Sequence, residues 1–249
     1  MKIQILNLPF DPLYKVILVD ADKGGSGKSC WTYVLAEWIN NKKLKFIGID
    51  CDQSNSNFLD HCGRIMHIEK GTLTEDQEQS WKTDNLMALP VEKETNIVAD
   101  FAAQSSRSQK SYFLGDRRGL LIAKHYNILF IKFYLCAGYY SAEQFVDSVK
   151  TFGGEMPHVL VLNEGLCSDF SFLNEYEELQ EVVEQYQIPI LRFQKIPYRE
   201  LMVMKTFRLS FSETIHSEHL NVAAKQCLIF YLRDHFEQID QLKLFDHEK

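Results

Sequence analysis

Residues 22–29 of this chain read D-K-G-G-S-G-K-S, between an apolar run at 16–19 and an amphipathic stretch at 31–39. This order predicts a strand, a glycine-rich turn and a helix. Glycines reach backbone angles that are closed to other residues and leave room for a phosphate chain. The N-terminus of the helix then presents unpaired N–H groups and a partial positive charge to an anion. We therefore expect Lys28 to reach the terminal phosphates of a nucleotide and the Ser29 hydroxyl to bind Mg²⁺.

Two later apolar runs end in carboxylates. Asp50 and Asp52 follow the run at 46–49, and Asp100 closes the run at 96–99. In a parallel sheet the carboxyl ends of the strands meet at one edge, where ligands bind. In phosphate-loop enzymes an Asp at the end of such a strand holds Mg²⁺, directly or through water. These acidic groups are therefore expected beside the phosphate loop, the name used here for residues 22–29.

Apolar runs alternate with amphipathic stretches along the chain, which predicts an α/β fold: a P-loop NTPase three-layer sandwich with a mostly parallel central sheet and helices on both faces. Residues 1–14, with Pro9 and Pro12, are expected to form an N-terminal extension or edge strand, and residues 15–249 a single domain. The expected strands are 15–20, 46–53, 64–68, 96–101, 127–135, 158–163 and 188–194, and the expected helices are 27–41, 58–62, 74–84, 112–125, 142–152, 170–186 and one from about 212.

Bulk composition limits the classes of function. The chain has 249 residues and a formal net charge of -7, which argues against a surface that holds nucleic acid by charge alone. No apolar run reaches the length of about 18 residues that a membrane helix needs. The six cysteines are scattered without a C-x-x-C pair, which favours reduced thiols in a cytoplasmic protein.

The phosphate loop departs at one position from the general pattern G-x-x-x-x-G-K-[ST], because Asp22 replaces the first glycine. With Lys23 the loop makes a narrower pattern, K-G-G-x-G-K-[ST], which resembles the deviant Walker A box of the ParA/MinD family of dimerising ATPases. Members of that family often lack the first glycine. The resemblance covers residues 16–199, and the two lysines are its most specific part. The compact chain and its D-K-G-G start also resemble plasmid-borne relatives of the StbB/TraL/MobD type.

The resemblance implies an ATPase that acts as a switch. Lys23 would reach across a dimer interface to the partner's nucleotide, as a charge supplied in trans. ATP would then join two protomers, and slow hydrolysis to ADP and phosphate would release them. Lys28 would bind the β- and γ-phosphates, and Asp52 would position the attacking water. Plasmid partition, plasmid stability or conjugative mobilisation is the implied process.

The resemblance also assigns residues to the ligands. Mg²⁺ would be held by Ser29 and, through its water shell, by Asp50 and Asp100. Asn163 resembles the position in the family that contacts adenine, and the I-P-Y segment at 196–198 resembles the one that lies along the adenine ring. The ATP-binding residues implied in this way are Lys23, Gly24, Gly25, Ser26, Gly27, Lys28, Ser29, Cys30, Asn163, Pro197 and Tyr198.

The target of such a switch is left open by the sequence. Besides the ATP-bound homodimer, an unidentified partner protein is expected. Six basic residues could bind DNA non-specifically or could be ordinary solvated residues, and the sequence leaves both alternatives open: Arg117, Arg118, Lys195, Arg199, Lys205 and Arg208. The tail at 236–249 is acidic rather than basic and amphipathic, so no membrane binding is expected.

Other classes of protein use similar loops. A redox relative would need a cysteine shortly after Asp100, and none lies between Asp100 and Leu135. A metal-chaperone or tail-anchor-targeting relative would want a C-x-x-C pair, which is absent. A small-molecule kinase and a non-catalytic, nucleotide-gated scaffold remain as alternatives to the ATPase.

Overall fold

A seven-stranded sheet forms the centre of the computed structural model, which describes residues 3–21, 23–52, 55–74 and 77–245. The strand order is β3-β2-β4-β1-β5-β6-β7, and every recorded strand pair is parallel. The predicted α/β fold is therefore confirmed. The strands are β1 (Tyr14–Asp20), β2 (Phe46–Asp50), β3 (Ile68–Lys70), β4 (Asn96–Asp100), β5 (Ile128–Cys136), β6 (His158–Asn163) and β7 (Ile190–Phe193).

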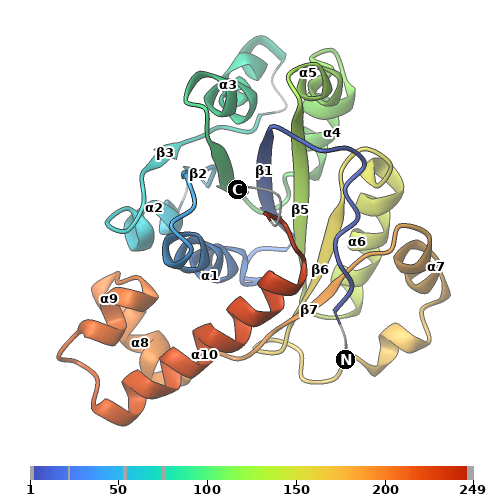
Figure 1. Ribbon diagram of the computed structural model, residues 1–249. Coiled ribbons are helices and arrows are strands. Elements are labelled where there is room, and N and C mark those ends of the chain that lie inside the picture. Colours follow the sequence, from blue (N-terminus) through green and yellow to red (C-terminus); the bar gives the residue numbers. More distant parts are fainter. Residues whose placement is uncertain (1–2, 22, 53–54, 75–76, 246–249) are drawn as a thin grey trace.

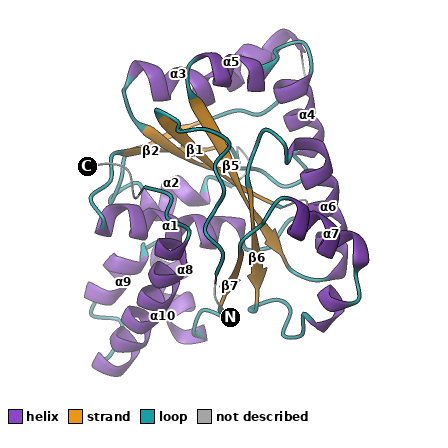
Figure 2. Cartoon of the chain, turned by 45° about the vertical axis from the view of Figure 1, so that its right-hand side comes forward, coloured by secondary structure: helices purple, strands orange, loops and turns teal. Residues whose placement is uncertain are grey.

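Helices cover both faces of this sheet and complete a three-layer sandwich (Figures 1 and 2). The helices are α1 (Lys28–Asn41), α2 (Asn57–Cys62), α3 (Asn85–Glu92), α4 (Ser106–Leu114), α5 (Gly119–His125), α6 (Tyr139–Phe152), α7 (Glu177–Gln185), α8 (Tyr198–Phe207), α9 (Phe211–His216) and α10 (Val222–Gln241). Two 3₁₀ segments, η1 (Gln77–Asp84) and η2 (Ser171–Asn174), precede α3 and α7.

Alternation along the strands produces two separate apolar layers, because successive strand side chains point to opposite faces. On β1, Ile17 and Val19 pack with α1, α2 and α8–α10, whereas Val16 and Leu18 pack with α3, α4 and α5. Helices α6 and α7 pack on β5 and β6 in a third cluster. All nine residues of β5 are buried, as expected for a central strand covered on both faces.

Three expected helices are wrong in their extent, because each is broken by a local turn. The expected helix at 112–125 is divided into α4 and α5, and the chain between them includes Arg118 with φ of +50°. The expected helix at 170–186 is divided into η2 and α7. The expected C-terminal helix is divided into α9 and α10, where Asn221 caps α10 by accepting from the backbone N–H of Ala224 at 2.9 Å.

Other expectations also differ from the structure. The expected strand at 64–68 lies later, as β3, and residues 3–13 form no strand. The expected helix at 74–84 is the 3₁₀ segment η1, and its residues 75–76 are outside the described residues. Helices α3 and α8 were not expected. Pro90 lies inside α3, and a proline in a helix interior removes a backbone donor, so the local pattern did not indicate a helix there.

The first and last segments of the described chain meet on the α1 side of the sheet. The backbone N–H of Leu6 donates to the carbonyl of Leu242 at 3.2 Å, and Leu6 is buried. Asp240 of α10 accepts from the Trp38 indole at 2.9 Å and from Lys42 at 2.8 Å. These contacts fasten α10 to α1, the helix that follows the phosphate loop.

Candidate functional site

The phosphate loop connects the end of β1 to the start of α1. Gly25 and Gly27 have φ of +76° and +94°, a region that favours glycine. A Cβ at Gly27 would also overlap the side-chain amide of Asn163. Helix α1 begins directly after Gly27, so its unpaired N–H groups are presented at the loop. Asp22, the unusual first residue of the motif, lies outside the described residues.

Lys28 lies beneath the loop rather than in solvent. Its ammonium group is 3.4 Å from the carbonyl oxygen of Ala21 and 3.5 Å from that of Lys23, and the side chain is buried. The neighbouring Ser26 hydroxyl is buried with no hydrogen-bond partner in the described part of the chain. A cation and an unsatisfied hydroxyl in a loop of open N–H groups form an arrangement suited to an anion.

The predicted convergence of the carboxylates is confirmed. Asp50 and Asp100 are direct register partners at the carboxyl ends of β2 and β4. Burial raises the pKa of Asp100 to about 7, although hydrogen bonds from Ser29 and Thr32 and the charge of Lys28 act in the opposite direction. Asp100 is therefore expected to bind a proton readily near neutral pH when no cation is bound.

Asp50 has a structural role at the same edge. Its Oδ1 accepts from the backbone N–H of Asp52 at 3.1 Å, and its Oδ2 accepts from that of Leu59 at 2.9 Å. Burial raises the pKa of Asp50, and these hydrogen bonds lower it. Asp50 thus fixes the turn into α2 and the position of Asp52, whose own Oδ1 accepts from the backbone N–H of Asn55 at 3.1 Å.

The Mg²⁺ ligands proposed from the sequence fit that ion. Ser29 lies close enough to Asp100 to lower the pKa of its carboxyl group, and Asp50 lies on the adjacent strand. Mg²⁺ in nucleotide sites typically takes one or two protein oxygens and completes its shell with phosphates and water. Within the described residues, no cluster of three His, Cys, Asp or Glu side chains suits a metal held by protein alone.

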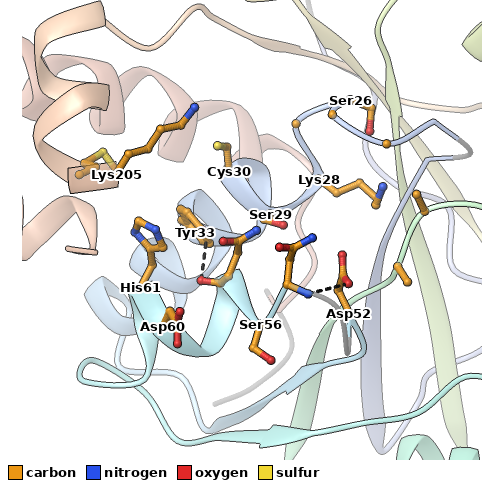
Figure 3. Close-up of a pocket in the computed structure, with 18 of the residues that line it drawn as sticks. Ser26, Lys28, Ser29, Cys30, Tyr33, Asp52, Ser56, Asp60, His61 and Lys205 are labelled. Atoms are coloured by element: carbon orange, nitrogen blue, oxygen red, sulfur yellow. Dashed lines mark hydrogen bonds between the residues drawn. The ribbon is translucent and has the colours of Figure 1, made fainter. Parts of the chain in front are cut away.

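A cavity of about 870 Å³ opens beside the phosphate loop. We call it the loop cavity (Figure 3). Residues 24–30 form one wall, Asp52 and residues 55–57 form a second, and Ala102 and Ala103 follow β4. The opposite wall comes from α2 and α8, with Asp60, His61, Leu201, Met204, Lys205 and Arg208. Its size suits a chain of phosphates with a metal ion and water.

A smaller cavity of about 200 Å³ adjoins the loop cavity. We call it the Asn163 cavity. Phe193, Ile196 and Tyr198 line it together with Asn163, and the lining is largely apolar, as a base would require. Pro197 is the residue that caps the start of α8. Ile196 and Tyr198 therefore lie on the same cavity as Asn163, although they follow a different strand, whereas Pro197 is not among the described residues that line it.

Asn163 is already engaged with the protein backbone. Its Nδ2 donates to the Ser26 carbonyl at 2.8 Å, and its Oδ1 accepts from the backbone N–H of Gly165 at 2.9 Å. The side chain therefore links the phosphate loop to the segment after β6. One N–H and one lone pair are left for a ligand, so adenine contact stays a prediction beside this structural role.

Lys23 faces away from the loop cavity. It is exposed and lines a third cavity, of about 720 Å³, with Gly138, Tyr139 and Tyr140 at the start of α6. Among the described residues that line the loop cavity, Lys23 does not occur. Lys23 and Lys28 are thus directed to different sides of one loop.

The wall formed by α8 was missed by the sequence analysis. Lys205 and Arg208 were considered only as surface groups for DNA, but both line the loop cavity. The residues that follow the I-P-Y segment are R-E-L-M-V-M-K, and all of them except Val203 are good helix formers, which could have indicated α8.

A family model described as "CobQ/CobB/MinD/ParA nucleotide binding domain" matches residues 17–206 of the chain. Protein TraL from Escherichia coli is 24% identical over 237 residues, which are 91% of this chain and 97% of that protein.

Solved structures align at lower identity. The MinD cell division protein of Aquifex aeolicus aligns with a TM-score of 0.48 and 15% identity over 88% of this chain and 96% of that chain. A plasmid partition protein from Borrelia burgdorferi aligns with a TM-score of 0.43 and 14% identity over 94% and 99% of the two chains. No helix in the described ranges is both long and apolar enough to span a bilayer.

Proposed function

Because the chain belongs to the CobQ/CobB/MinD/ParA nucleotide-binding family, we propose that it is an ATPase whose ATP-bound form dimerises and acts as a molecular switch. The observation that carries this proposal is the arrangement of the two loop lysines. Lys28 is buried beneath the loop beside the cavity, whereas Lys23 is exposed and directed to the other side. One protomer then uses Lys28 for its own nucleotide, and Lys23 is free to reach the nucleotide of a partner.

The roles of the other residues follow from where the strands end. Asp100 and Ser29 adjoin one another and are proposed to hold Mg²⁺. Asp50, on the adjacent strand, is proposed to contact the water molecules that surround the ion. When bound, Mg²⁺ would neutralise charge on the phosphates during transfer. Asp52 is on the second wall of the loop cavity and is proposed to orient the attacking water. Hydrolysis is proposed to be slow, which suits a timer.

The cellular process is proposed at a coarser level. Plasmid partition, stability or conjugative mobilisation is favoured by the D-K-G-G start of the loop. The similarity to Protein TraL over nearly its whole length also supports this assignment. We infer a partner protein that reads the nucleotide state, because a switch needs a target that distinguishes its two forms.

Sedimentation velocity of the full chain with Mg²⁺ tests the switch. We expect a monomer with ADP and a dimer with ATP or a non-hydrolysable ATP analogue. Lys28→Ala should lose nucleotide binding, because it removes the buried ammonium group that lies against the loop carbonyls. Lys23→Ala should bind nucleotide and remain a monomer. A wild-type monomer with every nucleotide, or a stable dimer of Lys23→Ala, would contradict the proposed role.

Turnover of Asp52→Ala tests hydrolysis separately from binding. We expect this variant to bind ATP with Mg²⁺, to remain a dimer and to release phosphate far more slowly than the unaltered chain, as measured by a phosphate-release assay. Asp60→Ala is a matched control, because Asp60 lines the same cavity but pairs with Arg208 on the opposite wall. Wild-type turnover in Asp52→Ala would move the water-positioning role to another residue.

A further inference from the structure

The loop cavity and the Asn163 cavity share part of their lining. Five residues line both: Gly25, Gly27, Cys30, Leu201 and Lys205. A nucleotide with its terminal phosphates in the loop cavity and its base in the Asn163 cavity must pass through this junction. The ribose and the α-phosphate are the parts of the molecule that would lie there. The junction therefore determines how the protein binds the α-phosphate.

Lys205 is the only charged residue among these five. It is exposed on α8, and its side chain extends toward Cys30 and the phosphate loop (Figure 3). Across the described residues no carboxylate forms an ion pair with Lys205. Arg208, one turn later, differs in this respect, because it pairs with Asp60 at 2.8 Å. Lys205 therefore keeps a positive charge directed at the junction without a carboxylate partner in the described part of the chain.

Cys30 shows how close this charge lies to the loop. Burial raises the pKa of the Cys30 thiol to about 11, and the charge of Lys205 acts in the opposite direction. A neutral thiol is a weak hydrogen-bond donor and gives an anion little support. An ammonium group carries three donors and binds phosphate oxygens as a point charge. At this junction Lys205, and not Cys30, supplies the strong side-chain donor.

We propose that Lys205 binds the α-phosphate of the nucleotide, from α8 across the cavity from the phosphate loop. This inference rests on the proposed nucleotide site and adds a residue from a different element to it. AMP, ADP and ATP all carry an α-phosphate, so the contribution of Lys205 should be the same for all three. Because Lys205 is exposed, the contribution should weaken as salt concentration rises.

Isothermal titration calorimetry of the full chain tests the assignment. We expect Lys205→Met to bind both ADP and a non-hydrolysable ATP analogue about tenfold more weakly than the unaltered chain, a typical loss for one charge-assisted hydrogen bond. AMP, measured by displacement of ADP, should weaken by the same factor. Lys205→Arg should retain most of the affinity, because it keeps the charge. Lys124→Met on α5 is the matched control, since it removes an exposed helical lysine far from both cavities.

The outcomes separate this inference from the proposed function. If the unaltered chain binds ADP and Lys205→Met binds it equally well, the inference is wrong and the proposed function stands. A loss confined to the ATP analogue would also overturn it, because the ammonium group would then contact the γ-phosphate. If the unaltered chain binds no nucleotide, the proposed function itself fails. Lys205→Gln serves as a second variant that removes the charge. A thermal melt of each variant without nucleotide shows whether a loss of nucleotide affinity is caused by misfolding.

Discussion

At the scale of single residues, Gly27 is the most constrained position of the phosphate loop. Its φ of +94° is unfavourable for any residue with a Cβ, at a cost of roughly 1–2 kcal/mol. A Cβ there would also displace the Asn163 amide and break its hydrogen bond to Ser26. Gly27→Ala should therefore reduce the free energy of unfolding by about 2–4 kcal/mol, measured by urea denaturation without nucleotide.

Gly24→Ala provides the matched control for this prediction. Among the described residues, a Cβ at Gly24 would meet only the Ala103 Cβ, at 3.9 Å, and the backbone there is not in the positive-φ region. Its unfolding free energy should stay within about 0.5 kcal/mol of the unaltered chain. Equal stability of the two glycine variants would show that the loop relaxes around a Cβ at position 27.

His158 should make the stability of the protein sensitive to acid. Burial and the charge of Lys132 lower the pKa of His158 to about 3. In the unfolded chain its pKa is about 6.5, so between these values only the unfolded state binds the proton. Above pH 6.5 the neutral His158 makes its full contribution to the free energy of unfolding. As pH falls from 6.5 toward 3 this contribution is lost, by up to about 1.4 kcal/mol per pH unit.

His158→Gln removes this titration, because glutamine is neutral and can still face the Ser148 hydroxyl, which lies 3.0 Å from His158 Nε2. Urea denaturation at pH 7.5, 6.5, 5.5 and 4.5 should give a shallower loss of stability for the variant than for the unaltered chain. Parallel curves for the two proteins would mean that the buried imidazole accepts a proton without unfolding.

At the scale of elements, a buried polar network joins β1 to α4 and β5. Lys132 of β5 lies 3.3 Å from Asp20 Oδ2 at the end of β1 and donates to Gln109 Oε1 of α4 at 2.6 Å. Gln109 in turn donates to Asp20 at 2.8 Å. Lys132 and Gln109 have at most 1% of their surface exposed. The network therefore fixes the strand end that leads into the phosphate loop against the helix that follows β4.

Removing one charge from this network should be far more harmful than removing both. Lys132→Met leaves Asp20 buried without its cation, and we expect a loss of about 3–5 kcal/mol in unfolding free energy. In Lys132→Met with Asp20→Asn, the amide can still accept from Gln109, so the loss should be smaller by at least about 1 kcal/mol. The measurement is a double-mutant cycle by urea denaturation. Additive losses would mean that Asp20 and Lys132 do not stabilise one another.

The same elements show what local sequence patterns can and cannot predict. The strand, loop and helix at β1 and α1, and the bounds of β6, were predictable because the pattern and its stop signal are adjacent in the sequence. The Lys132 network was not predicted, because Asp20, Gln109 and Lys132 are brought together only by strand order. Helix α8 was missed for a related reason. It buries only Glu200 and Met204, so its apolar periodicity is weak.

The candidate site was predictable only in part. The phosphate loop and the three carboxylates were found from their positions at strand ends, and the structure brings Asp50 and Asp100 into register. The wall contributed by α8, with Lys205, could not be inferred, because α8 follows the last strand, β7, and the handedness rule for crossovers between parallel strands therefore does not place it. The hydrogen bonds from the Asn163 side chain to the backbone of Ser26 and Gly165 could not be predicted from the sequence either.

At the scale of the whole molecule, the distribution of charge bears on DNA binding. The chain carries a net charge of -7. The basic residues considered for DNA fall into two groups. Arg117 and Arg118 precede α5, whereas the second group lies on α8 or beside it: Lys195, Arg199, Lys205 and Arg208. Helices α5 and α8 pack on opposite faces of the sheet (Figure 1). Arg117 is paired with Asp84, and Arg208 is paired with Asp60. Each pairing reduces the charge available to a phosphate backbone.

We therefore expect the monomer to bind duplex DNA more weakly than the usual non-specific range, with a dissociation constant above about 100 µM near physiological salt. Fluorescence anisotropy of labelled duplex DNA, with ADP and with a non-hydrolysable ATP analogue, measures this across a salt series. Tight binding with ADP would contradict the prediction. Binding only with the analogue would mean that the DNA-binding surface forms in the dimer. Two protomers can bring together basic patches that are each too small to bind DNA in the monomer. Two double variants would then identify which group contacts the DNA: Arg117→Ala with Arg118→Ala, and Lys195→Ala with Arg199→Ala. The pair that contacts DNA is the one whose removal makes the affinity less dependent on salt concentration.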